Sequence, residues 1–163
     1  MVSCVYWRKK FCDERAGSGK VNGLMLDLSE PSQAGIAARL QQEEFAYFTT
    51  VRPDGRPHTV PVCFVWDGTT ILIFSPPDTI KIRNLHQNPH VSLALDNFGR
   101  DNTPVVVEGA AALVDDPDVN FMMAANVAKY TPLAERAGVT FEHLAQIYTA
   151  AIRITPTRIR QDQ

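Results

Sequence analysis

The amino-acid sequence predicts a mainly β protein of the α+β class, a six-stranded antiparallel β-barrel with peripheral helices. Two observations lead to this fold class. Short β-rich runs alternate with Asp-Gly and Pro-containing turns through the middle of the chain, and helical periodicity is confined to short stretches around them. Because unpaired sheet edges promote aggregation, an antiparallel meander of this kind usually closes into a barrel.

One folded domain at residues 25–163 is expected to follow an extension at residues 1–24. The extension carries charged side chains and Gly17-Ser18-Gly19 without a sustained period, which is typical of a poorly ordered segment. A chain of 163 residues suits a single hydrophobic core. The domain should begin with a helix capped by Ser32, whose apolar side carries Ile36 and Leu40 and covers one mouth of the sheet.

Three strands joined by two tight turns come next. Pro53-Asp54-Gly55 and Asp67-Gly68 mark the turns, because Asp-Gly pairs favour the backbone conformation that hairpins need. The strands are expected at residues 45–51, 57–66 and 69–75. They should form two antiparallel hairpins in series.

The second half of the chain adds three strands and three helices. Glu108-Gly109 interrupts an apolar strand with a charge and a glycine, which indicates a bulge or a close approach of backbones. Helices are expected at residues 78–88, 117–130 and 140–146, and strands at residues 90–96, 105–114 and 147–155.

Composition argues against nucleic-acid, membrane and disulfide chemistry. Sixteen Lys and Arg residues against eighteen Asp and Glu residues give a net charge of −2, so the basic excess that neutralises a phosphate backbone is missing. No apolar run reaches the roughly 20 residues of a membrane helix, and no secretion signal is recognisable. Three cysteines without a CxxC spacing favour neither disulfides nor zinc, so we expect a protein of the reducing cytoplasm.

No catalytic or metal-binding side chain can be assigned. The four histidines form no HxH or HExxH spacing, and no acid is spaced to orient one of them. Nucleophile elbows and Gly-rich phosphate loops are also missing from the sequence. We therefore predict neither a metal site nor an acid–base dyad.

An anion site is predicted where the helix at residues 78–88 begins. Lys81 falls in its first turn, where free backbone N–H groups and the positive end of the helix dipole favour an anion. Asn84 shares that helical face and Ser75 ends the preceding strand, so one pocket could collect all three side chains. The alternative is that Lys81 is an ordinary solvated lysine.

The strand segment His58, Thr59, Val60, Pro61 and Val62 is a second candidate region. Pro61 removes a hydrogen-bond donor from the strand, which usually marks an edge or a bulge. A free backbone edge can match the carbonyl and N–H groups along one side of a planar ring. The alternative is that Pro61 only protects an edge strand from aggregation.

Three linked segments resemble the pyridoxamine 5'-phosphate oxidase-like split β-barrel superfamily, and within it the branch of flavin and deazaflavin oxidoreductases. They lie within roughly 70 residues, in the family's order and spacing, and the end of the chain resembles the family's closing strand. The segments are the strand–turn–strand from Thr49 to Val62, the stretch Lys81-Ile82-Arg83-Asn84-Leu85 followed by Asn88-Pro89-His90-Val91, and the strand Val107-Glu108-Gly109-Ala110-Ala111.

This resemblance implies a split barrel of the FMN-binding type that holds coenzyme F420, with FMN as the alternative. The family's lysine at the position of Lys81 contacts the cofactor phosphate. Thr79 departs from several relatives, which carry a second basic residue there, and Arg83 is expected to compensate. The implied cofactor-binding residues are His58, Thr59, Val60, Pro61, Val62, Ser75, Lys81, Arg83 and Asn84.

The function implied by the resemblance is that of an oxidoreductase that transfers a hydride from F420 to a small planar or conjugated substrate. The cofactor would carry the chemistry, which explains why no acid–base dyad is visible. Two alternatives remain: an FMN-dependent oxidase or reductase of the same family, and a non-catalytic carrier of a flavin, haem or F420. Pyridoxamine-phosphate oxidation itself is not expected, because a second basic cluster for the substrate's phosphate is not recognisable.

A two-fold homodimer is the expected assembly. A single small split barrel leaves an apolar sheet face and part of a cofactor groove open, and such patches usually mark an interface. Val60, Val62 and Phe64 alternate along one strand and are expected to form that face. The groove would then be completed by the second chain.

Overall fold

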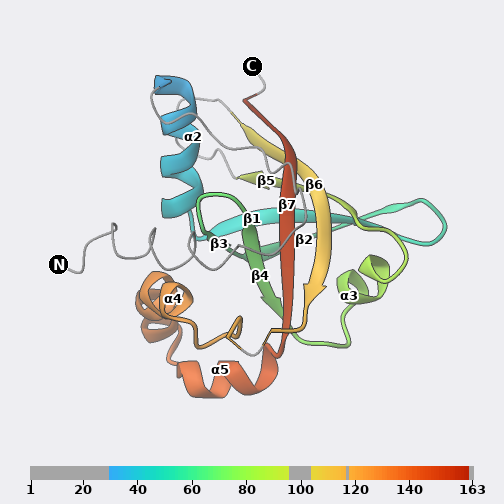
Figure 1. Ribbon diagram of the computed structural model, residues 1–163. Helices are drawn as coiled ribbons and strands as arrows, with labels where there is room; N and C mark the ends of the chain where they lie inside the picture. Colours follow the sequence, from blue (N-terminus) through green and yellow to red (C-terminus); the bar gives the residue numbers. More distant parts are fainter. Residues whose placement is uncertain (1–29, 96–103, 117, 162–163) are drawn as a thin grey trace.

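The computed structural model describes residues 30–95, 104–116 and 118–161, and in these residues seven strands form one antiparallel sheet in the order β2-β1-β5-β6-β7-β4-β3 (Figure 1). The extension predicted at residues 1–24 lies outside these ranges. The elements are α2 (Pro31–Gln42), β1 (Phe45–Val51), β2 (Pro57–Cys63), β3 (Val65–Trp66), β4 (Ile71–Ser75), α3 (Ile80–Leu85), β5 (His90–Leu95), β6 (Val105–Val114), α4 (Ala124–Ala137), α5 (Phe141–Ile147) and β7 (Ala150–Gln161).

The mainly β fold class is confirmed, but the strand count of six is wrong. The strand predicted at residues 57–66 is divided at Phe64 into β2 and β3, which pair with β1 and β4 respectively. Both predicted hairpins are present. Because β2 and β3 stand at opposite ends of the sheet order and only Phe64 separates them, the sheet must curl until its two ends meet.

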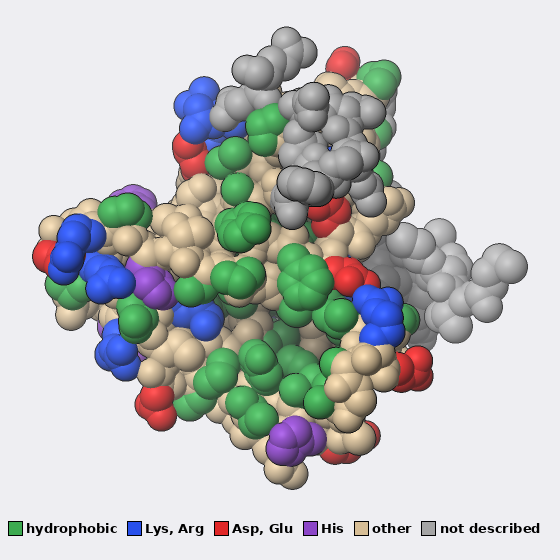
Figure 2. All heavy atoms as spheres, turned by 180° about the vertical axis from the view of Figure 1, so that it is seen from behind, with side chains coloured by type: hydrophobic (Ala, Val, Ile, Leu, Met, Phe, Trp, Pro, Cys, Tyr) green, Lys and Arg blue, Asp and Glu red, His purple; other side chains and the backbone are tan. Residues whose placement is uncertain are grey.

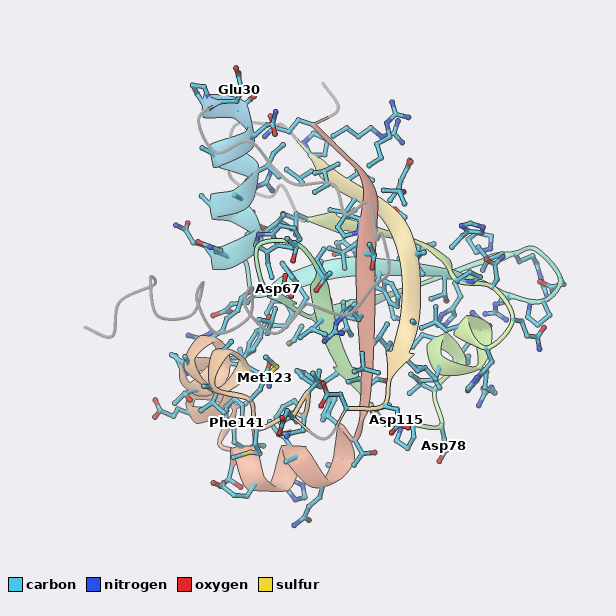
Figure 3. The ribbon with its side chains drawn as sticks, viewed as in Figure 1. Glu30, Asp67, Asp78, Asp115, Met123 and Phe141 are labelled. Atoms are coloured by element: carbon cyan, nitrogen blue, oxygen red, sulfur yellow. The ribbon has the colours of Figure 1, made fainter. Side chains whose placement is uncertain are left out.

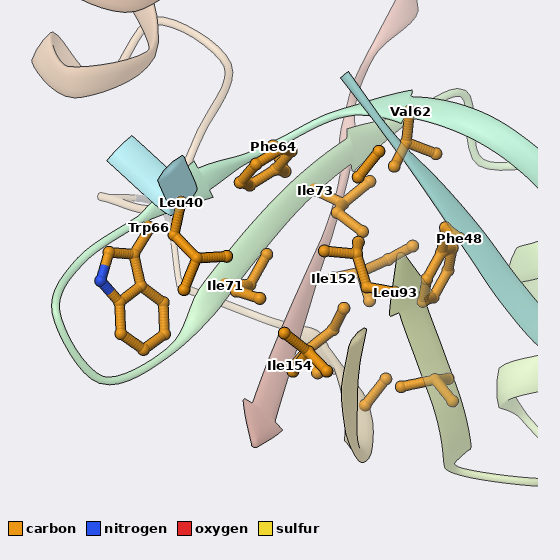
Figure 4. Packing of buried hydrophobic residues seen from close by; sticks show 14 of the residues in the cluster. Leu40, Phe48, Val62, Phe64, Trp66, Ile71, Ile73, Leu93, Ile152 and Ile154 are labelled. Atoms are coloured by element: carbon orange, nitrogen blue, oxygen red, sulfur yellow. The ribbon is translucent and has the colours of Figure 1, made fainter. Parts of the chain in front are cut away.

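The interior of this curled sheet holds the larger hydrophobic cluster. Leu40 of α2 is fully buried and lies beside Trp66 and Ile71, so α2 packs against one end of the sheet, as predicted (Figure 4). The predicted cap is wrong, because Glu30 is the N-cap and Ser32 lies inside the first turn of the helix. Ile82 and Leu85 of α3 also belong to this cluster. Burial of these side chains contributes about 1.5–3 kcal/mol each.

A second hydrophobic cluster lies between the sheet and helices α4 and α5. The helix predicted at residues 117–130 begins only at Ala124, because the side chains of Asp116 and Asn120 accept backbone N–H groups two residues on and form turns instead. It then continues through Pro132 until Gly138 ends it in the left-handed conformation.

The bulge predicted at Glu108-Gly109 is confirmed. The register between β6 and β7 shifts at this point, and Gly109 faces Pro156. A Cβ atom on Gly109 would lie 2.5 Å from the carbonyl oxygen of Thr155, so only glycine fits. The closing strand was predicted at residues 147–155, but β7 starts at Ala150 and runs to Gln161, because Ile147 ends α5 and the second half of β7 pairs with β6 beyond the bulge.

None of the helices in the described ranges is long and apolar enough to cross a membrane.

Candidate functional site

A pocket of about 550 Å³ opens between β2, the connection from β4 to α3, and the helices α4 and α5. Pro61, Val62 and Cys63 come from β2, and Thr79 and Lys81 come from the start of α3. The helices and the segments that join them to the sheet supply most of the remaining lining, which is largely apolar. Pockets of this size and character accept small molecules.

Lys81 is the charged residue of this pocket. Its side chain is half-buried, and burial lowers the pKa of its ammonium group. Within the described residues no carboxylate forms an ion pair with it. A half-buried cation without a counter-charge is costly, and an anionic ligand would supply that charge.

His58 lies within electrostatic reach of both Lys81 and Arg52. The pKa of His58 is lowered first by burial and then by the positive charges of Arg52 and Lys81. His58 Nδ1 is buried without a hydrogen-bond partner among the described residues. Asp54, the acid nearest to His58 in the sequence, forms an ion pair with Arg56, with 2.6 Å between a guanidinium nitrogen and a carboxylate oxygen. Figure 2 shows Lys, Arg and His side chains gathered at this end of the molecule, over the β1–β2 hairpin and α3.

Asn84 holds α3 against the barrel. Its Nδ2 donates to Thr50 Oγ1 at 2.9 Å, and Thr50 Oγ1 lies 3.4 Å from the carbonyl oxygen of His58. The chain of contacts therefore joins α3, β1 and β2. Because Lys81 stands in the same short helix, Asn84 also fixes Lys81 relative to β2.

The other predicted residues around α3 have different surroundings. Ser75 is fully buried, with its hydroxyl 2.9 Å from the carbonyl oxygen of Pro76 and 3.2 Å from Thr79 Oγ1. Arg83 is exposed and donates to the carbonyl oxygen of Asp78 at 2.9 Å. Neither side chain lines the pocket, whereas Lys81 does.

Strand β2 has two distinct faces, and the interface face predicted on it is wrong. Val62 and Phe64 are buried in the core inside the barrel and Val60 packs against it, because the curled sheet turns its apolar face inward. The exposed positions of β2 are Pro57, Thr59, Pro61 and Cys63. As predicted from Pro61, β2 is an edge strand of the sheet order. Of the segment predicted for cofactor contact, Pro61 and Val62 line the pocket.

Sequence reasoning missed Lys129 and Tyr130, which anchor α4 at the end of β2. The hydroxyl of Tyr130 accepts the N–H of Phe64 at 2.8 Å and lies 2.7 Å from the carbonyl oxygen of the same residue. Lys129 Nζ donates to that oxygen at 3.0 Å and stands 4.1 Å from the ring centroid of Phe64. Burial lowers the pKa of Lys129 to about 8 and raises that of Tyr130.

An aromatic group forms the pocket wall beneath α4 and α5. Phe121 is its centre: its ring centroid lies 5.3 Å from that of Tyr148, 5.4 Å from that of Phe141 and 5.7 Å from that of Phe74. Figure 3 shows Phe141 and Met123 in the space between these helices and the sheet. Sequence analysis did not predict the group, because its four rings come from β4, α5 and two connecting segments.

Among the described residues no three His, Cys, Asp or Glu side chains are placed to hold a metal ion. Among its described lining residues the pocket offers one cation, part of an edge strand and an apolar wall of aromatic rings. This combination fits a planar molecule that carries an anionic group.

Comparison with known proteins gives a family. Residues 33–162 match the family model described as pyridoxamine 5'-phosphate oxidase, and none of the curated proteins matches the chain. An F420 reductase structure is 25% identical with a TM-score of 0.59, and the match covers 76% of this chain and 94% of that one.

Two further solved structures share the fold. An FAD-binding protein from Mesorhizobium loti is 20% identical, with a TM-score of 0.56 and coverage of 77% of this chain and 88% of that one. The haem storage protein HutZ from Vibrio cholerae is 20% identical, with a TM-score of 0.57 and coverage of 85% and 95% respectively.

Proposed function

The chain belongs to the pyridoxamine 5'-phosphate oxidase family, and from this and the pocket we propose that it is an oxidoreductase that uses coenzyme F420 to reduce a small planar or conjugated substrate. The observation that carries the proposal is the position of Lys81, a half-buried cation without a carboxylate partner in the described residues, at an apolar pocket beside an edge strand. The F420 reductase among the similar structures supports this choice of cofactor.

Different parts of the pocket would hold the phosphate and the ring of such a cofactor. Lys81 binds its phosphate, and Arg52, whose charge also reaches His58, adds positive potential. The backbone edge of β2 around Pro61 orients the ring, and the apolar lining excludes water. When bound, the deazaflavin supplies the hydride chemistry itself, which is why the side chains need only position and shield it.

FMN is the alternative cofactor on the same site. Thr79 lines the pocket where several F420-binding relatives are expected to carry a second basic residue, so the site holds one cation fewer than they do. Arg83, exposed on α3, is the residue proposed to compensate. Titration of the purified protein with F420 and with FMN, each followed by its own absorbance, decides between them.

A non-catalytic carrier is the second candidate function. It is favoured by similar structures that are named as FAD-binding and haem storage proteins. A measurement of substrate turnover distinguishes the oxidoreductase from the carrier. Tight F420 binding without reduction of any enone or quinone in a panel would favour the carrier.

Replacing Lys81 tests the phosphate site. We expect Lys81→Ala to weaken F420 binding about 10- to 100-fold, because a charge-assisted hydrogen bond contributes about 1.5–3 kcal/mol. Lys81→Arg should retain most of the affinity. The control is Arg136→Ala, which removes an exposed cation outside the pocket lining that pairs with Glu44. Unchanged affinity of Lys81→Ala in the titration would reject this site.

A further inference from the structure

We infer that the part of the pocket beneath α4 and α5 is the substrate site, and that it selects a flat, uncharged, aromatic or conjugated molecule. The inference rests on the proposed function, because the pocket is shared with the residues that would hold the cofactor: Pro61 and Lys81 line it together with the helices. A ring seated along β2 would therefore have the aromatic wall as its neighbour.

Charge is unevenly distributed over the lining. Among the described lining residues, Lys81 is the one that carries a full charge at neutral pH. Cys63 and Tyr130 also line the pocket, but desolvation by the surrounding protein raises the pKa of both groups, so both are neutral at neutral pH. With Lys81 engaged by the cofactor phosphate, no lining cation is left for an anionic substrate.

Two of the polar side chains beneath the helices, Asn126 and Tyr130, already form hydrogen bonds with the protein. The side chain of Asn126 is buried and donates to the carbonyl oxygen of Phe121 at 2.8 Å. The hydroxyl of Tyr130 is held by the backbone of Phe64. An ionic substrate group placed here would lose its water without gaining a counter-charge from the described lining residues beneath the helices, which costs several kcal/mol.

The aromatic wall suits a flat ring. Phe121 stacks on Tyr148 with an interplanar angle of 27°, whereas Phe74 meets Phe121 nearly edge-on at 74°. A conjugated ring can gain contact with both ring faces and ring edges in such a group. The pocket volume of about 550 Å³ has room for a two-ring molecule beside the edge strand.

Two tryptophan substitutions on one helix test the location of the site. Ala137 is the last residue of α4, is exposed and lines the pocket, so Ala137→Trp fills the pocket without repacking the core. Ala128 is also exposed on α4 but does not line the pocket, so Ala128→Trp is the matched control. Val139→Trp offers a second filling variant just beyond the helix.

The probes are 1,4-naphthoquinone and its 2-sulfonate, titrated into the protein with and without oxidised F420. We expect the neutral quinone to bind at least tenfold more tightly than the sulfonate. Ala137→Trp should weaken naphthoquinone binding at least tenfold and leave F420 affinity within twofold, and Ala128→Trp should change neither. Equal affinity for the two quinones, or naphthoquinone binding unaffected in both filling variants, would overturn the inference.

Failure of the proposed function gives a different result. If wild-type protein binds no F420, the proposed cofactor is wrong, whereas the quinone titrations of the unloaded protein still decide whether the pocket selects neutral rings. Pyridoxamine 5'-phosphate serves as a third probe. If pyridoxamine 5'-phosphate competes with F420 and Lys81→Ala abolishes this competition, the probe binds at the phosphate site. If Ala137→Trp removes its binding instead, the probe binds beneath α4 and α5, which would contradict the inference.

Discussion

Two side chains of α4, those of Lys129 and Tyr130, form hydrogen bonds with the backbone of Phe64 at the pocket. The residue separates β2 from β3, so its N–H and carbonyl groups lie outside both strands. The hydroxyl of Tyr130 has one proton to donate and lies near two carbonyl oxygens, those of Phe64 and Glu44. Lys129 Nζ also donates a hydrogen bond to the carbonyl oxygen of Phe64. Together they fix α4 over the end of β2, which sets the width of the pocket.

Removing the Tyr130 hydroxyl should therefore cost stability. We expect Tyr130→Phe to lower the free energy of unfolding by about 1–3 kcal/mol, because the buried N–H of Phe64 would lose its partner. Urea denaturation measures this. The control is Tyr148→Phe, because the ring of Tyr148 stacks on Phe121 and its hydroxyl has no hydrogen bond to another described residue. Equal losses in the two variants would contradict this role of Tyr130.

Sequence reasoning reached some residues of the pocket but not others, for a physical reason. Lys81 and Pro61 were predicted because each has a local signal, a position in a helical turn and a missing strand donor. Tyr130 acts on Phe64, 66 positions away in the sequence, so no local signal exists for it. The alternation of side chains along β2 predicted two faces, but the face with Val62 was assigned to the dimer interface. That assignment is wrong, because Val62 is buried in the barrel interior.

Among the elements, the junction of β6 and β7 depends most on one backbone conformation. The bulge at Glu108-Gly109 places Gly109 opposite Pro156, which has no N–H to donate. The irregular register therefore accommodates a proline inside a paired strand. It also brings the backbone of Thr155 so close that a side chain on Gly109 has no room.

An alanine at this position should destabilise the barrel. We expect Gly109→Ala to lower the free energy of unfolding by about 1–3 kcal/mol, because the added Cβ would meet a backbone oxygen that cannot rotate away. Thermal and urea unfolding measure the loss. Gly35→Ala is the matched control: nothing lies within 4 Å of its Cβ position in α2, so alanine should stabilise that helix by about 0.5–1 kcal/mol. A stable Gly109→Ala protein would mean that the two strands can separate without cost.

Element boundaries were predicted well where local chemistry sets them and poorly where long-range pairing does. The bounds of Phe45–Val51 and Val105–Val114 agree with the predicted strands, and the turn at residues 53–55 follows the end of the first. The division of the strand at Phe64 follows from two different pairing partners, β1 and β4, at opposite ends of the sheet. Such a division leaves no mark in the alternation of a single strand.

At the scale of the whole molecule, closure of the sheet decides which surfaces stay open. The outward side chains of β1 and β2 include Phe45 and Tyr47, with exposed fractions of 45% and 49%. Across the strands, Tyr47 faces Pro61 on one side and Ala94 on the other. The resulting patch is apolar, and Figure 2 shows hydrophobic side chains gathered over the middle of this face.

We propose that this patch, rather than the buried face first predicted, forms the two-fold interface of a homodimer. Exposed apolar patches usually mark interfaces, and an obligate dimer would bury about 2,000 Å² or more. The patch is continuous with the cofactor pocket, because Phe45, Pro61 and Cys63 belong to both. A second chain seated on the patch would therefore stand beside the cofactor as well.

The expected mass in solution is twice 18.1 kDa by light scattering at low micromolar concentration. We expect Tyr47→Asp to shift the protein to a monomer, because two buried carboxylates would meet near the symmetry axis without partners. F420 affinity should fall with it, since the groove loses its second wall. Met122→Asp is the control: Met122 has a similar exposed fraction, 43%, but lies outside β1 and β2, so that variant should remain dimeric. A wild-type monomer that binds F420 as tightly as any dimeric fraction would refute the shared groove, because one chain would then hold the whole cofactor site.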